Sequence, residues 1–395
     1  MTGLAPLLGH TGLREMLAAA SDRGDLPSAL LLLGPAGTGK QRLALWLAQR
    51  LVCESPPGTE PCGRCHACRL AVRLEHPDVH WFFPLPRPKV SGGAERLGDA
   101  LEDARAAELV SRRSDPHYPT IANELAGIYL AHVQVIRRLA IRRPAMGRRK
   151  VFVIGDAESL VPQESSPEAA NAALKLLEEP PPDTTIVLTA SDGEALLPTI
   201  RSRLLTVRVP PLARDEVERF LRESRGIGAE EAVRVACLAD GSIGRALAFL
   251  PGDDGPGPLE SARQQAFKLL DAALEGGTAR YTCALEQAPA GARGSFSTVL
   301  SLLITWLRDL AAVASDAEDA VVNADRIEDL RRRAALVPEA ASRAAGAIPE
   351  VERMLQLATF NINPQLVLGT LLGSLSRRFG RIRGGSPRRP ARSAG

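Results

Sequence analysis

The sequence has 395 residues, of which 45% are hydrophobic and 4% aromatic, and its formal net charge is +3. This length exceeds what one core usually serves, so we expect two or three domains. The small net charge gives no argument for nucleic-acid binding by itself. We find no run of about 18 apolar residues that would cross a membrane. Met1–His10 lacks the basic segment and apolar core of a signal peptide, so we expect a cytoplasmic protein.

Short apolar runs alternate with helical patterns in the first half of the chain. Lys40–Val52 is amphipathic and predicts a helix directly after a Gly-rich turn. The apolar runs predict five strands, at residues 29–33, 79–83, 151–154, 185–189 and 206–209. Buried strands that alternate with helices indicate an α/β fold with a parallel, doubly wound sheet.

The pattern then becomes helical, and this change divides the chain. We expect an α/β domain at 1–208, a small helical lid at 209–250, a linker at 251–258 and an all-helical domain at 259–376. Residues 84–125 are polar and form an expected, partly helical insertion without an assigned role. The Arg-rich tail at 377–395 should be disordered; it either touches phosphates weakly or only improves solubility.

A phosphate-binding loop follows the first predicted strand. Gly34, Gly37, Gly39 and Lys40 have its spacing, in which glycines let backbone N–H groups surround an anion and a lysine adds charge. The next residue should be Ser or Thr, whose hydroxyl holds Mg²⁺, but it is Gln41. Two interpretations stay open: a loop that binds ATP, and a loop that is retained for structure.

The strand at 151–154 should end in the acidic residues that hold the metal and orient water. It is followed by Gly155 and Asp156, so only one acid comes directly after it. Gly and Asp are also common in ordinary turns. Together with Gln41, this second departure argues against efficient ATP hydrolysis by the chain itself.

Four cysteines near the loop helix have the spacing C-x₈-C-x₂-C-x₂-C: Cys53, Cys62, Cys65 and Cys68. Two overlapping C-x₂-C units and one further thiolate can complete a tetrahedral, structural Zn²⁺ site. His66 and His76 are alternative ligands. Cys237 and Cys283 lie far away in helical segments, and we expect them in the core.

These motifs, in this order, resemble the delta-prime subunits of the bacterial DNA polymerase III clamp loader, a family of the AAA+ class. The resemblance covers nearly the whole chain except the insertion and the tail. Asn171–Pro181 (NAALKLLEEPP) is its most specific segment. Thr199–Leu204 is similar to the clamp-loader Ser-Arg-Cys motif, with Leu204 in place of the Cys. Gly9-His10, His76-Pro77-Asp78 and Asn361–Leu368 also fit.

The resemblance implies a clamp-loader subunit without its own ATPase. Such subunits form a hetero-pentamer with delta and gamma/tau subunits through helical collar domains, and the complex places the sliding clamp on primer-template DNA. Arg203 would be the arginine finger that reaches a neighbour's ATP site in trans. Gly155 would stand at the metal-binding Asp, and Asp156 at the water-positioning acid. Arg245 comes one residue later than the family's second sensor arginine.

Two alternatives remain. The chain could be the ATP-hydrolysing gamma/tau-type motor subunit, which also has a phosphate loop with Lys40 and a zinc module, provided that Gln41 and Gly155 are tolerated. It could also be a zinc-containing nucleic-acid-binding module unrelated to clamps, but this leaves Asn171–Pro181 and Thr199–Leu204 unexplained.

Overall fold

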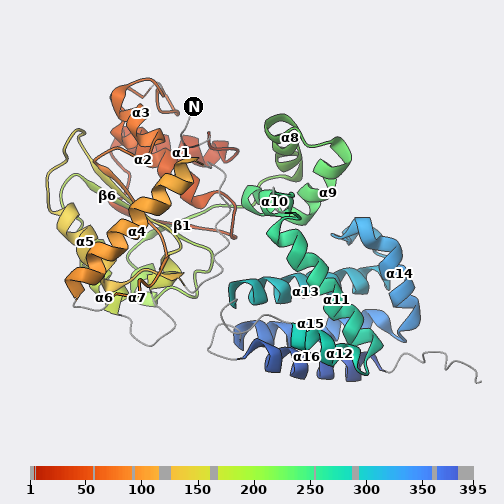
Figure 1. The fold of residues 1–395 in the computed structure, drawn as a ribbon. Helices are drawn as coiled ribbons and strands as arrows, with labels where there is room; N and C mark the ends of the chain where they lie inside the picture. The colour runs from red at the N-terminus through yellow and green to blue at the C-terminus, as the bar shows by residue number, and fades with distance from the viewer. Residues whose placement is uncertain are drawn as a thin grey trace, which may run out of the picture. The chain divides into compact units, whose positions relative to one another are not determined.

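The computed structural model describes residues 4, 6–56, 58–90, 94–114, 126–160, 168–252, 255–286, 293–357 and 363–380. Residues 91–93 and 115–125 of the expected insertion, 253–254 of the linker, 287–292 and 358–362 of the expected helical domain and 381–395 of the tail lie outside these ranges. The chain divides into two compact units, and the division falls between Pro251 and Gly252. Each unit is described by itself (Figure 1).

The first unit contains a five-stranded parallel sheet in the order β2-β5-β6-β1-β7. Its strands are β1 (Ala29–Leu33), β2 (Val79–Phe82), β5 (Lys150–Ile154), β6 (Thr184–Ala190) and β7 (Leu205–Arg208). Every strand predicted from the sequence is present, and the parallel α/β class is confirmed. The apolar runs form strands because β1, β5 and β6 are buried on both faces of the sheet.

Side chains alternate between two apolar cores, one on each face of the sheet. Leu30 and Leu32 join one core, whereas Leu31 joins the other. The first core is covered by α1 (Thr11–Arg23), α2 (Lys40–Val52), α3 (His66–Val72) and α4 (Ala94–Ser114). The second is covered by α5 (Leu130–Ala140), α6 (Glu168–Glu178) and α7 (Pro198–Arg201). The helix predicted after the phosphate loop is α2, with the predicted bounds.

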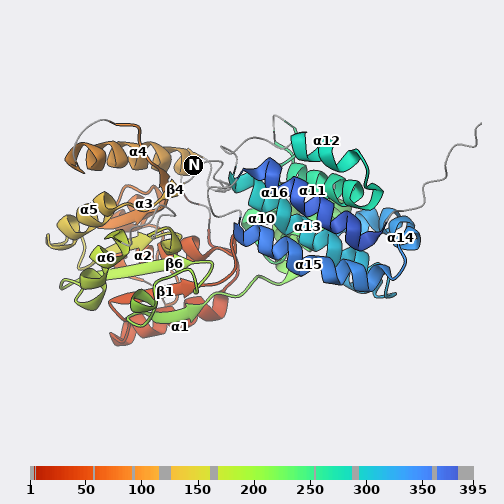
Figure 2. The same ribbon diagram turned by 90° about the horizontal axis from the view of Figure 1, so that it is seen from below.

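The insertion contributes the long helix α4, which lies next to α5 in both views (Figures 1 and 2). The insertion begins with strand β3 (Leu85–Pro86) and is followed by strand β4 (Ala126–Gly127). These two strands form a short antiparallel pair. After the sheet, the first unit ends in α8 (Arg214–Arg225), α9 (Ala229–Ala239) and α10 (Ile243–Phe249). One 3₁₀ turn, η1 (Ala157–Leu160), follows β5.

The described part of the second unit is helical apart from an isolated bridge between Gly252 and Gly255. Its elements are α11 (Pro258–Glu275), α12 (Ala279–Glu286), α13 (Arg293–Val313), η3 (Glu318–Ala320), η4 (Ala324–Arg326), α14 (Ile327–Leu336), α15 (Ala340–Leu357) and α16 (Pro364–Phe379). Residues 377–379 therefore belong to a helix, whereas we had placed them in the tail. Helix α13 is the central element, against which α11, α14 and α15 pack. Among the described residues, its stretch Phe296–Val313 alone is long and apolar enough by composition to cross a membrane, although Arg308 and Asp309 interrupt its apolar run, and 61% of it is buried within the fold.

Candidate nucleotide and metal sites

The phosphate loop connects β1 to α2 in the first unit, as predicted. Gly37 and Gly39 have φ angles of 76° and 91°, in the left-handed region that favours glycine. Gly34 is required for a different reason, because a Cβ atom there would overlap the backbone carbonyl of Val209. The predicted loop residues Gly34, Gly37, Gly39 and Lys40 therefore lie together at the carboxyl end of β1.

Lys40 is buried and turns back onto its own loop. Its Nζ donates to the carbonyl oxygen of Pro35 at 2.7 Å and to Ser191 Oγ at 3.1 Å. Burial lowers the pKa of Lys40, while the nearby carboxylates of Asp156 and Glu158 raise it. The ammonium group thus has protein partners at the place where a phosphate loop uses lysine to hold a phosphate.

Gln41, at the position where a P-loop enzyme has Ser or Thr, has partners at both ends of its amide. Its Nε2 donates to Asp156 Oδ2 at 3.0 Å, and its Oε1 accepts from Trp81 Nε1 at 3.0 Å. These partners come from β2 and from the turn after β5. An amide that is held from two sides is a fixed part of the fold and not a mobile side chain.

Gly155 lies directly under this amide. A Cβ atom at residue 155 would be 2.6 Å from Gln41 Cδ and Oε1 and 2.8 Å from Nε2. Burial raises the pKa of Asp156, whose backbone N–H donates to Thr189 Oγ1 at 3.1 Å. Burial also raises the pKa of Glu158, and its Oε1 accepts from the backbone N–H of Ser191 at 3.0 Å. Asp156 and Glu158 are therefore near Lys40. Residue 155 is a glycine and contributes no third carboxylate.

The helices after the sheet contact the phosphate loop through α10. The Gly244 N–H donates to the Gly37 carbonyl at 3.4 Å, and Ser242 Oγ would collide with any Cβ at Gly37. Arg245 lies beside them, and its Nε is buried without a hydrogen-bond acceptor among the described residues. Burial lowers the pKa of Arg245, and Asp240 raises it. The arginine that stands one position late in the sequence is therefore close to the loop.

Arg203 lies in the segment between α7 and β7. Its Nε donates to the carboxylate of Glu178, the last residue of α6, and its second nitrogen donates to the Thr199 carbonyl at 2.6 Å. The side chain remains 35% exposed. Leu204, in place of the family's Cys, is buried in the core. Arg201 pairs with Glu194 at 2.6 Å instead.

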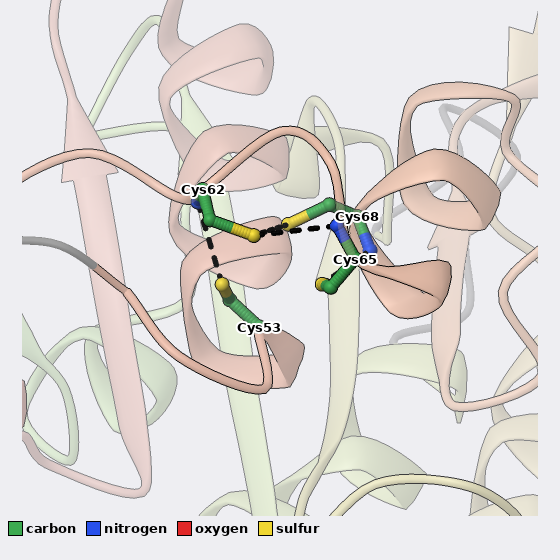
Figure 3. Close-up of side chains that lie close together, drawn as sticks. All are labelled: Cys53, Cys62, Cys65 and Cys68. Atoms are coloured by element: carbon green, nitrogen blue, oxygen red, sulfur yellow. Dashed lines mark hydrogen bonds between the residues drawn. The ribbon is translucent and has the colours of Figure 1, made fainter.

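The four predicted cysteines converge at the start of α3 (Figure 3). Their sulfur atoms all lie within 4.8 Å of one another, and Cys62 Sγ is 3.9 Å from Cys68 Sγ. A tetrahedral Zn²⁺ with bonds of about 2.3 Å places its sulfur ligands about 3.8 Å apart. The four thiols therefore have the geometry of a closed, structural metal site. His66 and His76 are not in this group, and His76 Nδ1 instead accepts from the Asp78 N–H at 3.0 Å.

Backbone N–H groups point at the cysteine sulfurs, as in a site for thiolates. The N–H groups of Cys62, Cys65 and Cys68 donate to Cys53, Cys62 and Cys65 at 3.4, 3.4 and 3.3 Å, respectively. The N–H groups of Cys65 and Arg64 lower the pKa of Cys62 to about 6. Burial raises the pKa of Cys68. Such hydrogen bonds orient metal ligands and stabilise their negative charge. Cys237 and Cys283 are only partly buried, so the expectation that they lie in the core was wrong.

Several residues of these sites were not identified from the sequence, because their partners are distant in the chain. They are Trp81, Arg112, Glu178, Ser191 and Ser242. Glu178 is part of the family-like segment Asn171–Pro181, but the sequence pattern does not indicate its contact with Arg203. Nothing in the pattern of residues 84–125 connected Arg112 to the phosphate loop.

The comparisons with known proteins agree with the sequence motifs. A family profile described as DNA polymerase III, delta subunit, matches residues 9–213. The DNA polymerase III subunit delta' of Pseudomonas aeruginosa is 32% identical over 221 residues, which are 56% of this chain and 55% of that protein. The delta' subunit of Escherichia coli is 28% identical over 241 residues, 61% of this chain and 59% of that protein.

More distant matches include the tau subunit of Escherichia coli, 26% identical over 303 residues that cover 72% of this chain and 40% of that protein. A gamma subunit-related protein of Thermotoga maritima aligns over 92% of this chain and 99% of its own, with 18% identity and a TM-score of 0.38. The chain spans less than two thirds of the length of the delta' relatives that it matches. Since the family profile covers more than half of its residues, the chain belongs to the DNA polymerase III delta subunit family.

Proposed function

We propose that the chain is a delta-prime-type subunit of a DNA polymerase III clamp loader and supplies Arg203 to the ATP site of a neighbouring subunit. In this role it assembles with delta and gamma/tau subunits in the cytoplasm, and the complex acts on the sliding clamp and primer-template DNA. The family assignment and the named delta' relatives support the assembly. The chain itself would hydrolyse little or no ATP.

One combination of features carries this proposal. A glutamine side chain occupies the place of a magnesium ligand, and an arginine elsewhere in the same unit is accessible. Gln41 occupies the space beside Gly155 where a magnesium ligand would be needed. Arg203 is one third exposed and held by Glu178, so its guanidinium is near the surface in a defined orientation. A planar, permanently charged group of this kind stabilises charge on a transferred phosphoryl group.

The test is the ATPase rate of the reconstituted loader, with clamp and primed DNA, carrying this chain as wild type, Arg203→Ala or Lys40→Ala. We expect Arg203→Ala to lower the rate strongly, since an arginine finger contributes about 10³–10⁵-fold in related phosphoryl transfers. Lys40→Ala should leave it nearly unchanged. Arg201→Ala is the matched control, because it removes a neighbouring arginine that is paired with Glu194.

The alternative is a gamma/tau-type motor subunit. The similarity to tau subunits and the phosphate loop support it. It predicts that Lys40→Ala lowers the rate as deeply as Arg203→Ala does. That result would overturn the proposed role, as would a loader whose rate does not depend on Arg203. ATP binding without hydrolysis is compatible with the proposed role.

We further propose that the four cysteines hold a structural Zn²⁺. All four positions of a tetrahedral site are filled by thiols, which leaves no open position for water and hence no catalytic role. Metal analysis of the purified chain should give about one zinc per chain. Cys62→Ser should lower this content, and Cys237→Ser, outside the cluster, should not. Full zinc retention in the Cys62→Ser variant would exclude this site.

A further inference from the structure

Arg112 of the insertion helix α4 lies over Trp81, the residue that donates a hydrogen bond to the Gln41 amide. Arg112 is only 6% exposed, and it pairs with Glu108 on the same helix at 2.9 Å. Its guanidinium carbon lies 4.6 Å from the ring centroid of Trp81 and 3.8 Å from that of Phe83. A second arginine of α4, Arg105, covers Phe82 at 4.7 Å. The insertion thus covers the end of β2 with two guanidinium groups, which aromatic rings attract, and each is also paired with a glutamate of α4.

Trp81 connects Arg112 to the phosphate loop. One face of its indole is under the guanidinium, and its Nε1 donates to the Gln41 amide, which in turn donates to Asp156. Trp81, Gln41 and Asp156, from β2, α2 and the turn after β5, therefore form a hydrogen-bonded network, and Arg112 of α4 covers its tryptophan by a cation–π contact. Such a network is costly to bury unless every member has a partner, and here each member does.

The network is located where a hydrolytic site would hold its ion. In P-loop enzymes the residue after the lysine and the acid at the end of a later strand bind Mg²⁺. Here the first is Gln41 and the second is Gly155, and the Gln41 amide fills the space of the missing side chain. Gly155 does not have a positive φ angle, so the close approach of Gln41, and not backbone conformation, requires the glycine.

With the Gln41 amide in this space, the charge of the Asp156 carboxylate has to be balanced by side chains of the protein. Burial raises the pKa of Asp156, and Lys40, the Gln41 amide and, to a smaller extent, Arg112 lower it. Arg112 is linked to Asp156 through Trp81 and the Gln41 amide. We propose that the insertion exists to supply Arg112 as a fixed internal cation, so that the guanidinium and the Gln41 amide permanently replace the divalent metal of this site. This inference concerns the isolated chain and does not depend on the action of Arg203 in trans.

A thermal double-mutant cycle tests the role of Arg112. Arg112→Met keeps an unbranched apolar side chain over Trp81 but removes the charge, and Asp156→Asn removes the charge that it balances. We expect Arg112→Met to lower the melting temperature of the wild-type chain clearly more than that of the Asp156→Asn variant. Additive losses would show that Arg112 only packs on the aromatic rings, and would overturn its assigned role. Arg138→Met, an exposed position on α5, is the control.

Added Mg²⁺ or Mn²⁺ tests the replacement of the metal. The melting temperature of the wild-type chain, with ADP at a fixed concentration, should not respond to either ion. The rebuilt variant Gln41→Thr with Gly155→Asp should gain a metal-dependent rise. A wild-type rise as large as that of the rebuilt variant would overturn the proposal. If the rebuilt variant does not fold, the wild-type response and the Arg112 cycle still decide.

Discussion

Arg203 is held by Glu178 across 25 residues of sequence, from the end of α6 to the segment between α7 and β7. The Thr199 carbonyl accepts from the same guanidinium at 2.6 Å. Both side chains are partly exposed, so the ion pair adds little stability, about 0–1 kcal/mol. What it fixes is the direction of the guanidinium.

Glu178→Gln should therefore reduce the loader's ATPase without unfolding the chain. If Arg203 is the proposed arginine finger, we expect a loss smaller than that of Arg203→Ala and expressed in kcat rather than in KM, because such a finger acts in the transition state. Glu178→Asp, which keeps the charge, should restore part of the rate, and Glu179→Gln is the neighbouring control. A rate unaffected by Glu178→Gln would mean that the Thr199 carbonyl or the neighbouring subunit, and not Glu178, orients Arg203.

If the four cysteines hold the proposed zinc, its removal should loosen the cysteine module before the rest of the unit. Trp46 reports on this region, because its Nε1 donates to Glu60 Oε2 at 2.8 Å, in the loop between Cys53 and Cys62. A chelator should change the fluorescence of Trp46, and Trp46→Phe should abolish that change. Since thiolates bind zinc in competition with protons, the module should also release metal more readily at acidic pH. Unchanged Trp46 fluorescence upon complete zinc loss would contradict a structural role for the ion.

A buried arginine organises the second unit. Arg263 donates to Glu260, Asn323 and Asp325 at 2.8–3.0 Å, and its carbonyl accepts from Trp306. Breaking a buried pair on one side leaves uncompensated charges, so Arg263→Ala should cost about 3–5 kcal/mol in urea unfolding. Arg332→Ala, at an exposed ion pair, should cost far less. Equal losses would show that Arg263 is no more important than a surface residue.

Asp78 anchors the loop between α5 and β5 and should make the fold sensitive to acid. Its carboxylate accepts from the N–H groups of Ala145, Met146 and Gly147 at 2.6, 2.8 and 2.9 Å. Burial alone would raise the pKa of Asp78, but these three donors together bring it below its ordinary 3.8. A carboxyl with a lowered folded-state pKa adds stability above its unfolded value and loses it as pH falls through the folded one.

Asp78→Asn should therefore cost about 2–4 kcal/mol at neutral pH, from the loss of charge-assisted hydrogen bonds. The difference from wild type should shrink as pH is lowered through 3.8 and below. Urea unfolding of both proteins across this range measures it. A difference that stays constant with pH would assign the cost to packing and not to the charge of Asp78.

The sequence predicted local features well and long-range partners poorly. The five strands, helix α2 and the Cys cluster depend on hydrophobic pattern and on spacing within short segments, and the structure has them where they were expected. Gln41 and Gly155 were noticed as two separate departures. Their contact could not be predicted, because 114 positions separate them and only the parallel pairing of β2, β5 and β6 brings β5 next to α2.

The contact between Gln41 and Gly155 makes a prediction about residue replacement. Gly155→Ala should cost about 1–3 kcal/mol, because the new methyl group would meet the held amide at 2.6 Å. In a Gln41→Ala background the same change should cost little, since the amide is absent. Gly98→Ala is the matched control: in α4 the added methyl group meets only Ala131 Cβ at 4.0 Å, and alanine favours a helix. Chemical unfolding of the four variants of the cycle gives the coupling. A Gly155→Ala cost that is the same in both backgrounds would mean that the backbone at residue 155, and not the Gln41 amide, requires glycine.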